Sequence, residues 1–254
     1  MKNIDIYNFL CTLAPPELQM SFDNSGFLVG DINAKVHNVL LSLDVTDAVI
    51  DEAIEKNCEL IVSHHPFIWD PLKSVTAEQL TSRKLMKLIK RDISVISMHT
   101  NLDIAEGGVN DVLISLLGAE CCGKLDGDNC GRIGVLPNET ELNDFLDFCR
   151  ERLNTCGLRY VDGGKKVKRL AVMGGAGADA MADAIAKGCD TYVTADIKYH
   201  QFLEAKELGL NLIDADHFCT EAPVMSVLAE KIKAAYPELD VRVSSVHSQV
   251  VSFA

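Results

Sequence analysis

Residues 36–65 decide the fold. They read VHNVLLSLD (36–44), TDAVIDEAIEKN (46–57) and CELIVSHH (58–65). The first and last of these segments are continuous apolar runs, which are typical of strands buried in a parallel sheet. The middle segment repeats apolar residues on one helical face, and Thr46 stands where a helix N-cap is expected. A strand, a helix and a strand within about thirty residues predict a right-handed βαβ unit.

Alternating strands and helices continue on both sides of this unit. The expected elements of the first half are an N-terminal helix stopped by Pro15 and Pro16, a loop at 21–30 (SFDNSGFLVG), a helix at 77–92, a third buried strand at 92–103 (DISVISMHTNLD) and a short helix at 107–118. Strands that alternate with helices predict an α/β fold with a parallel sheet.

The second half of the chain repeats the same order. Its expected elements are strands at 168–175, 189–196 and 210–221 and helices at 176–188 and 200–209. The segments IEKNCELIVSHH and IAKGCDTYVTAD correspond in position and pattern. We therefore interpret the fold as α/β with two related βαβ-based halves, 1–123 and 124–254, that arose by a degenerate duplication. The chain ends in ELDVRVSSVHSQVVSF, whose alternation predicts a half-exposed strand.

Composition excludes several classes of protein. The 254 residues carry a formal net charge of −13 and contain no Lys/Arg tract, so we expect no nucleic-acid binding. No apolar run approaches the roughly 20 residues of a membrane helix, and the N-terminus makes a poor signal peptide. The nine cysteines form no CxxC pair, which favours reduced thiols in the cytoplasm over a thiolate zinc site.

Polar side chains of metal-binding type follow the predicted strands. They are His64, His65, His99, Asp103, His217 and Glu221. Ligands in open α/β sheets bind at the carboxyl ends of the strands. Imidazoles and carboxylates without thiolates suit zinc, iron, manganese or nickel and do not suit a calcium cage.

The adjacent pair His64 and His65 raises the question of packing or chemistry. Neighbouring side chains of a regular strand point to opposite faces. In an irregular loop braced by Pro66, the two imidazoles can instead reach two different metal ions, which favours a dinuclear centre. The ordinary structural explanation is a pair bonded to backbone at a strand end. The third histidine and the two carboxylates at equivalent strand ends favour metal binding.

The remaining candidates leave alternatives open. We expect Thr220 to cap a helix that starts at Glu221, so that His217 lies in the loop before it. Glu221 then either only complements the helix dipole or does so while also bridging two cations. Asp103 is either a ligand or a turn residue bonded to its own backbone, and His99 is a ligand, a general base or a partner that orients a ligand.

The turn GGAG (174–177) joins a predicted strand to a helix start. Such a turn either cradles a phosphate or needs glycine only for its positive φ angles. It lacks the full GxGxxG spacing and the lysine of a P-loop, so it is a weak phosphate signal.

Several motifs together resemble one known family. FDNSGFLVG, SHHPFIW, HTNLDIAEGGVND, GGAG and DADHFCTEAP occur in this order. Over essentially its full length the chain resembles the Nif3-like dinuclear-metal-centre hexameric proteins, also called GTP cyclohydrolase 1 type 2 homologues, in their short form without a middle insertion. It departs from them at TADIKYHQ (194–201), where the family commonly has Gly-Glu followed by paired histidines and this chain has Asp196 and a single His200.

The resemblance implies two divalent metal ions per chain in the cleft between the halves. His65 and Asp103 would hold one ion, His64 and His217 the other, and Glu221 would bridge both. It also implies a toroidal homohexamer with these sites facing an inner cavity.

The function that follows is metal-dependent hydrolysis of a nucleotide-like small molecule, GTP by resemblance, with His99 as the catalytic residue that moves a proton. The alternative is a non-enzymatic ring protein that binds, stores or delivers metal.

Overall fold

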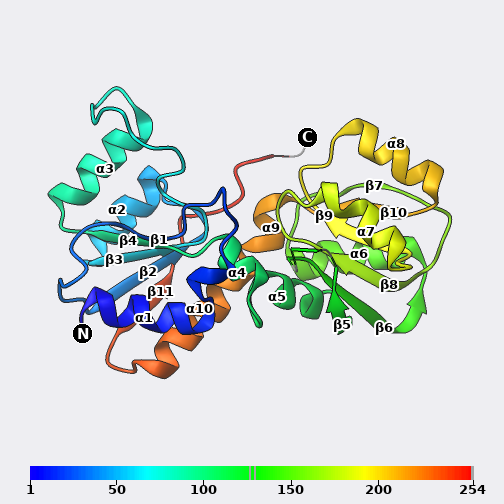
Figure 1. Ribbon diagram of the computed structural model, residues 1–254, viewed down its shortest axis with the longest axis horizontal. Coiled ribbons are helices and arrows are strands. Elements are labelled where there is room, and N and C mark those ends of the chain that lie inside the picture. Colours follow the sequence, from blue (N-terminus) through cyan, green and yellow to red (C-terminus); the bar gives the residue numbers. More distant parts are fainter. Residues whose placement is uncertain (126, 129, 253–254) are drawn as a thin grey trace. The chain divides into compact units, whose positions relative to one another are not determined.

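The computed structural model describes residues 1–125, 127–128 and 130–252. The chain divides into two compact units, each built on its own sheet (Figure 1). The first unit comprises Met1–Ala105 and Val224–Ser248, and the second comprises Glu106–Pro223 and the residues from Gln249 onward. Each compact unit is thus formed by two segments that alternate along the sequence. The predicted contiguous halves 1–123 and 124–254 stay a prediction.

The first unit is built on a five-stranded sheet in the order β1-β4-β3-β2-β11. Its strands are β1 (Gly26–Val29), β2 (Asn38–Ser42), β3 (Leu60–Ser63), β4 (Ser94–Ser97) and β11 (Asp240–Val243). The last four strands are parallel, and β1 pairs antiparallel with β4 at one edge. The apolar runs of β2 and β3 are buried as predicted, because helices cover both faces of this sheet.

Helices lie on both faces of the first sheet. They are α1 (Asn3–Leu13), α2 (Asp47–Glu55), α3 (Leu80–Lys90) and α10 (Pro223–Ala235), with the short helices η1 (Pro16–Leu18) and α4 (Thr100–Ile104). In Figure 1, α2 and α3 lie on one face and α1 and α10 on the other. Leu40, Ile61 and Val95 of the three central strands pack in one cluster with residues of α2 and α3. Thr46 caps α2 as predicted, since its side chain accepts from the Val49 amide at 3.1 Å.

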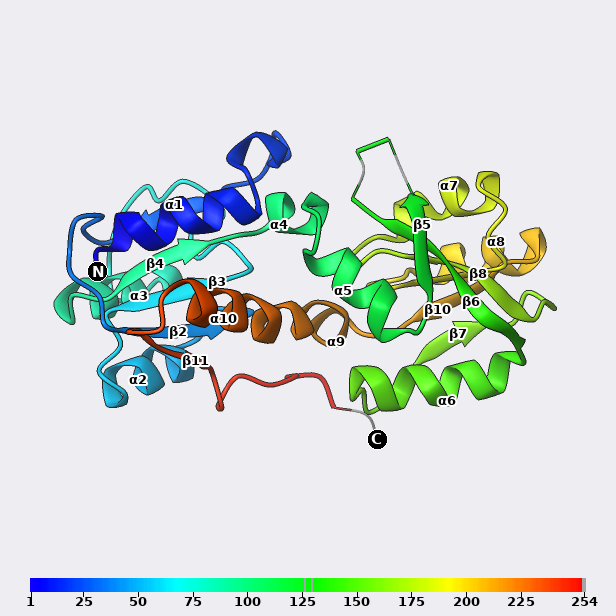
Figure 2. The same cartoon turned by 90° about the horizontal axis from the view of Figure 1, so that it is seen from below.

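The second unit is built on a six-stranded sheet in the order β5-β6-β8-β9-β10-β7. Its strands are β5 (Glu120–Lys124), β6 (Arg132–Thr140), β7 (Arg159–Val161), β8 (Val167–Val172), β9 (Thr191–Thr194) and β10 (Asn211–Asp214). Its helices are α5 (Val109–Leu116), α6 (Leu142–Leu153), η2 (Ala178–Ala180), α7 (Met181–Ala186), α8 (Tyr199–Leu208) and α9 (His217–Glu221). Apolar residues of α5 and α6 pack with those of β8, β9 and β10 in one core cluster. Figure 2 shows α6 and α7 on opposite sides of this sheet.

Each unit contains three consecutive parallel strands joined by helices. These are β2, β3 and β4 in the first unit and β8, β9 and β10 in the second. The predicted α/β class with two related βαβ-based units is therefore confirmed. In each unit the carboxyl ends of these strands lie at one edge, where ligands bind in open α/β sheets.

Four predicted elements differ from the structure. The expected loop at 21–30 contains strand β1, which forms because it pairs with β4. The strand expected over 92–103 covers only Ser94–Ser97, and helix α4 follows it. The strand expected over 210–221 ends at Asp214, where helix α9 takes over, and the C-terminal strand spans only Asp240–Val243. For β1 tertiary pairing outweighs the local pattern, and for the strand expected over 210–221 the cap at Asp216 starts a helix.

Among the described residues, no helix has the length and hydropathy that crossing a membrane requires. The cytoplasmic location stays a prediction.

Candidate metal-binding site

His64 and His65 follow directly on β3, and the chain after β2 holds their backbone. The amides of His64 and His65 donate to the Leu43 carbonyl at 3.2 and 2.9 Å. The Ser63 hydroxyl donates to the His65 carbonyl at 2.9 Å and lies 2.8 Å from the Ser97 hydroxyl. The pair is therefore fixed in a short irregular segment at the carboxyl end of a central parallel strand, as the sequence predicted.

The three candidate imidazoles of the first unit, those of His64, His65 and His99, each place Nδ1 against an oxygen. The acceptors are Met98 O for His64 at 2.8 Å, Asp44 Oδ1 for His65 at 2.7 Å and Asp23 Oδ1 for His99 at 2.7 Å. A carbonyl or an ionised carboxylate only accepts, so each Nδ1 carries the hydrogen. In the neutral imidazole the lone pair then lies on Nε2. This is the arrangement in which a protein prepares a histidine to bind a metal.

The two carboxylates that orient these rings are held in the ionised form. Burial raises the pKa of Asp23, but hydrogen bonds from His99 and from neighbouring hydroxyl groups outweigh it and bring the pKa well below its ordinary value. Burial also raises the pKa of Asp44, and hydrogen bonds from His247 and His65 again bring the pKa well below that value. Asp23 and Asp44 thus act as acceptors near neutral pH.

The three rings form one cluster. The ring centroids of His64 and His65 are 5.0 Å apart, and that of His99 is 5.1 Å from His64 and 5.6 Å from His65. Ligand atoms of all three lie within 4.8 Å of one another. Asp103 Oδ1 lies 3.6 Å from His64 Nε2. Asp103 belongs to helix α4, where its amide donates to the His99 carbonyl at 3.0 Å, so it lies in a helix and not in the turn that the alternative explanation required.

In the second unit the donors lie on α9, and here the sequence prediction was wrong. His217 and Glu221 are the first and last residues of this helix, and His217 Nε2 lies 3.1 Å from Glu221 Oε2. The N-cap is Asp216, whose side chain accepts from the Cys219 amide at 3.1 Å, and not Thr220. Because the cap is Asp216 and not Thr220, the helix begins four residues earlier in the sequence than predicted. His217 and Glu221 therefore lie on one face of the same helix.

Asp196 orients His217, and the sequence analysis missed this role. His217 Nδ1 lies 2.7 Å from Asp196 Oδ2, which leaves Nε2 toward Glu221. Asp196 follows β9, Asp216 follows β10, and their φ angles are +53° and +75°. Non-glycine residues with positive φ concentrate at functional sites. The signal in the sequence was the aspartate that ends the strand predicted over 189–196, at the place where the chain departs from the resembled family.

Gly175 provides the space for the two donors of the second unit. Its φ angle is +63°, and an added Cβ would lie 2.1 Å from Glu221 Oε1 and 3.1 Å from His217 Nε2. Its amide lies 3.1 Å from the Thr220 hydroxyl, to which it donates. For the GGAG turn these contacts favour the tight-turn explanation, with the further requirement that residue 175 has no side chain.

Cys219 lies between the two donors in sequence but is not a ligand. It packs in the core cluster of the second unit. Burial and the neighbouring Asp216 raise the pKa of its thiol to about 12. Among the described residues, the groups of side chains close enough together to hold a metal ion include His217 and Glu221 but not Cys219.

The residues present fit a divalent metal. In both units an imidazole whose Nδ1 is held by an acceptor places Nε2 next to a carboxylate. Histidine and carboxylate ligands suit zinc and other first-row metals. Gly175 keeps the donor atoms of the second unit clear of any Cβ.

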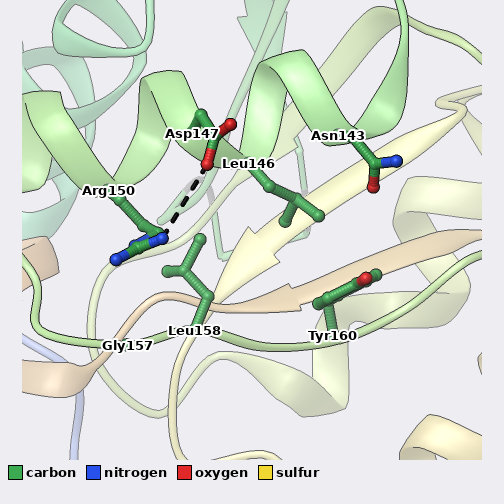
Figure 3. Close-up of a pocket in the computed structure, with 7 residues that line it drawn as sticks. All are labelled: Asn143, Leu146, Asp147, Arg150, Gly157, Leu158 and Tyr160. Atoms are coloured by element: carbon green, nitrogen blue, oxygen red, sulfur yellow. Dashed lines mark ion pairs between the residues drawn. The ribbon is translucent and has the colours of Figure 1, made fainter.

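The second unit also has a pocket whose lining includes none of the candidate metal ligands. Its volume is about 430 Å³, and Figure 3 shows its lining on α6 and on the chain leading into β7. The lining residues are Asn143, Leu146, Asp147, Arg150, Gly157, Leu158 and Tyr160. Its charged residues form an ion pair, with Arg150 Nη1 3.8 Å from Asp147 Oδ1. It contains no imidazole and none of the predicted site residues.

Comparison with known proteins places these clusters in a family context. The family model described as Duf34/NIF3 (NGG1p interacting factor 3) matches residues 1–251. The GTP cyclohydrolase 1 type 2 homolog of Clostridium acetobutylicum is 35% identical, with 98% of this chain and 96% of that protein covered. Its namesake from Clostridium perfringens is 37% identical over 92% of each. The crystal structure of Staphylococcus aureus hypothetical protein SA1388 covers 100% of this chain and 99% of its own, with a TM-score of 0.91 and 30% identity.

Proposed function

The chain belongs to the Duf34/NIF3 family, and we propose that it is a dinuclear metal-binding protein that hydrolyses a nucleotide. The observation that carries this proposal is the orientation of four imidazoles. His64, His65, His99 and His217 each place Nδ1 against an oxygen and so offer Nε2. A buried histidine that served only packing would have no need for this shared orientation. The relatives' name, GTP cyclohydrolase 1 type 2 homolog, supplies the substrate class.

In this proposal donors of both units serve the same pair of ions. His65 and Asp103 would hold one ion, His64 and His217 would hold the other, and Glu221 would contribute to both.

His99 is proposed as the group that moves the proton. When bound, two divalent ions activate water as a nucleophile and stabilise negative charge on a substrate oxygen. His99 is oriented by Asp23 and has its ring beside those of His64 and His65. With its lone pair on Nε2 it can accept a proton as a general base. The protein thus contributes five ligands and one base of fixed tautomer.

The assembly implied by the resemblance is part of the proposal. We expect a homohexamer of 27.7-kDa chains. Light scattering coupled to gel filtration measures this mass directly. A monomer at micromolar concentration would contradict the ring while leaving the ligand assignment intact.

Turnover is tested with metal-loaded protein. Wild type, His99→Ala and Glu221→Ala are loaded with zinc, manganese, iron or nickel and assayed on GTP and on a generic phosphoester. We expect His99→Ala to keep both ions and to lose about 100-fold or more in rate, whereas Glu221→Ala loses metal and rate together. If the wild type binds two ions but turns over no substrate of the panel, the protein is the metal-binding or storage alternative.

A further inference from the structure

Two large aromatic side chains of the first unit are presented to solvent side by side. Phe22 is 66% exposed and Trp69 is 50% exposed. Their ring centroids are 6.3 Å apart, with an angle of 49° between the ring planes. Single exposed apolar residues are common, but adjoining exposed aromatic rings are characteristic of binding surfaces.

The aromatic pair continues directly into the cluster of imidazoles. The Trp69 ring meets the His99 ring edge-on, with centroids 5.6 Å apart and an interplanar angle of 81°. His99 in turn contacts His64 and His65. The rings of Phe22 and Trp69 and the imidazoles of His99, His64 and His65 therefore form one connected group.

Hydrogen bonds fix both loops that carry the aromatic pair. Asp23, next to Phe22, accepts from His99 Nδ1 and from the hydroxyls of Thr100 and Ser25, at 2.6–2.7 Å. Asn24 Nδ2 donates to the Ile68 carbonyl at 2.6 Å, which ties the loop of Phe22 to the loop of Trp69. A surface that is already ordered binds with a smaller entropy loss. The loops that carry Phe22 and Trp69 are thus held by residues next to these rings in sequence.

We propose that Phe22 and Trp69 form a stacking subsite for the planar heteroaromatic ring of a nucleotide. The inference rests on the proposed function, because it names the part of the same site that recognises the ring. Aromatic side chains bind nucleobases through their faces, and this stacking tolerates different bases. Phe22 and Trp69 offer exposed apolar rings, while the polar side chains of Asp23 and Asn24 beside Phe22 are engaged in hydrogen bonds. The subsite therefore selects a ring and does not select one base over another.

Trp69 makes the test specific, because it is the only tryptophan in the chain. Intrinsic fluorescence therefore reports on one position of the subsite. The full-length protein is titrated with GMP, AMP and ribose 5-phosphate, both after metal removal and after zinc loading. Free tryptophan corrects for absorption by the nucleotides. We expect saturable quenching by GMP and AMP with dissociation constants within about tenfold of each other, and none by ribose 5-phosphate at the same concentrations.

Two substitutions separate the subsite from general surface effects. Phe22→Ala removes one stacking face and should raise the dissociation constant for GMP by roughly 5- to 150-fold, the range measured for loss of one base–aromatic stack. The control Tyr199→Ala removes an aromatic ring of α8 that is 82% exposed and should change nothing. The side chain of Phe22 is mostly exposed, so the melting temperature should stay close to that of wild type, and thermal melting checks this.

The outcomes distinguish the subsite from the metal proposal. Absence of quenching in both metal states, or equal affinity of Phe22→Ala and wild type, overturns the subsite. Quenching by GMP in a protein that binds no metal would support the subsite and remove the metal proposal. Two bound ions without quenching by nucleotides would support the metal proposal and overturn the subsite.

Discussion

The first unit carries three candidate imidazoles on segments that follow two strands, whereas the second carries one imidazole and one carboxylate on a single five-residue helix. In the first unit each ring has its own acceptor, so a substitution disturbs one ligand at a time. In the second unit His217 and Glu221 share α9 and both adjoin Gly175, so one change disturbs both. We therefore expect a substitution in the first unit to weaken one ion and to spare the other. A substitution in the second unit should weaken both ions together.

Glu221→Ala tests the shared response most strongly. Two cations a few ångströms apart repel each other, and a carboxylate between them offsets that repulsion. We expect the affinity for both ions to fall by about 100-fold or more. Equilibrium dialysis followed by elemental analysis measures it. The exposed Glu207 of α8 provides a control, since Glu207→Ala should keep both ions. Two ions at wild-type affinity in Glu221→Ala would show that this residue is only a charge at the end of a short helix.

His65→Ala tests the independent response. We expect one ion to bind roughly 100-fold more weakly and the other to be largely spared, because each terminal imidazole serves one ion. The fold should survive, since the unit rests on the buried strands β2, β3 and β4. The measurement is metal content together with thermal melting, with and without added metal. Equal loss of both ions would break the contrast between the two clusters.

Gly175→Ala tests whether the second cluster depends on one backbone position. The added Cβ would meet Glu221 Oε1 at 2.1 Å, so we expect about tenfold weaker binding of both ions. Gly188→Ala is a matched control, because Gly188 has a φ angle of +72° and its added Cβ would meet no atom within 4 Å. Both variants carry the cost of a left-handed alanine, about 1–2 kcal/mol. Equal metal affinity in the two variants would contradict the role of Gly175.

Asp44→Asn tests the smallest effect, that of an orienting partner. Asparagine keeps an oxygen that can accept from His65 Nδ1 but loses the negative charge. We therefore expect about tenfold weaker binding of one ion, the lower end of the range for such partners. Asp47→Asn, in the nearby helix α2, should leave both ions unaffected. A decrease as large as that of His65→Ala would mean that Asp44 itself is a ligand.

The regular parts of the fold were predictable because they depend on local pattern. The buried strands β2 and β3, the cap at Thr46 and the repeated order of strands and helices follow from apolar periodicity and propensity. Strand β1 was not predictable in the same way. Its Gly- and Asn-containing surroundings resemble a loop, and only pairing with β4, some seventy residues away, makes it a strand.

The candidate site was predictable in its ligand types and less so in its geometry. Imidazoles and carboxylates after predicted strands indicated metal chemistry, and the structure gathers His64, His65 and His99 in one cluster. The helix carrying His217 and Glu221 was misplaced, because Asp216 and Thr220 are both good caps and the backbone decides between them. The orienting roles of Asp23, Asp44 and Asp196 depend on contacts between distant segments, which the pattern around each aspartate does not contain.

The number of metal ions per chain tests the central claim most directly. The metal-free wild-type protein is equilibrated with zinc, manganese, iron or nickel in turn, unbound metal is removed by dialysis, and metal and protein are measured in the same sample. The account predicts two ions per chain with at least one of these metals, because three oriented imidazoles and two carboxylates provide ligands for two ions. At most one ion per chain with every metal would contradict the dinuclear centre.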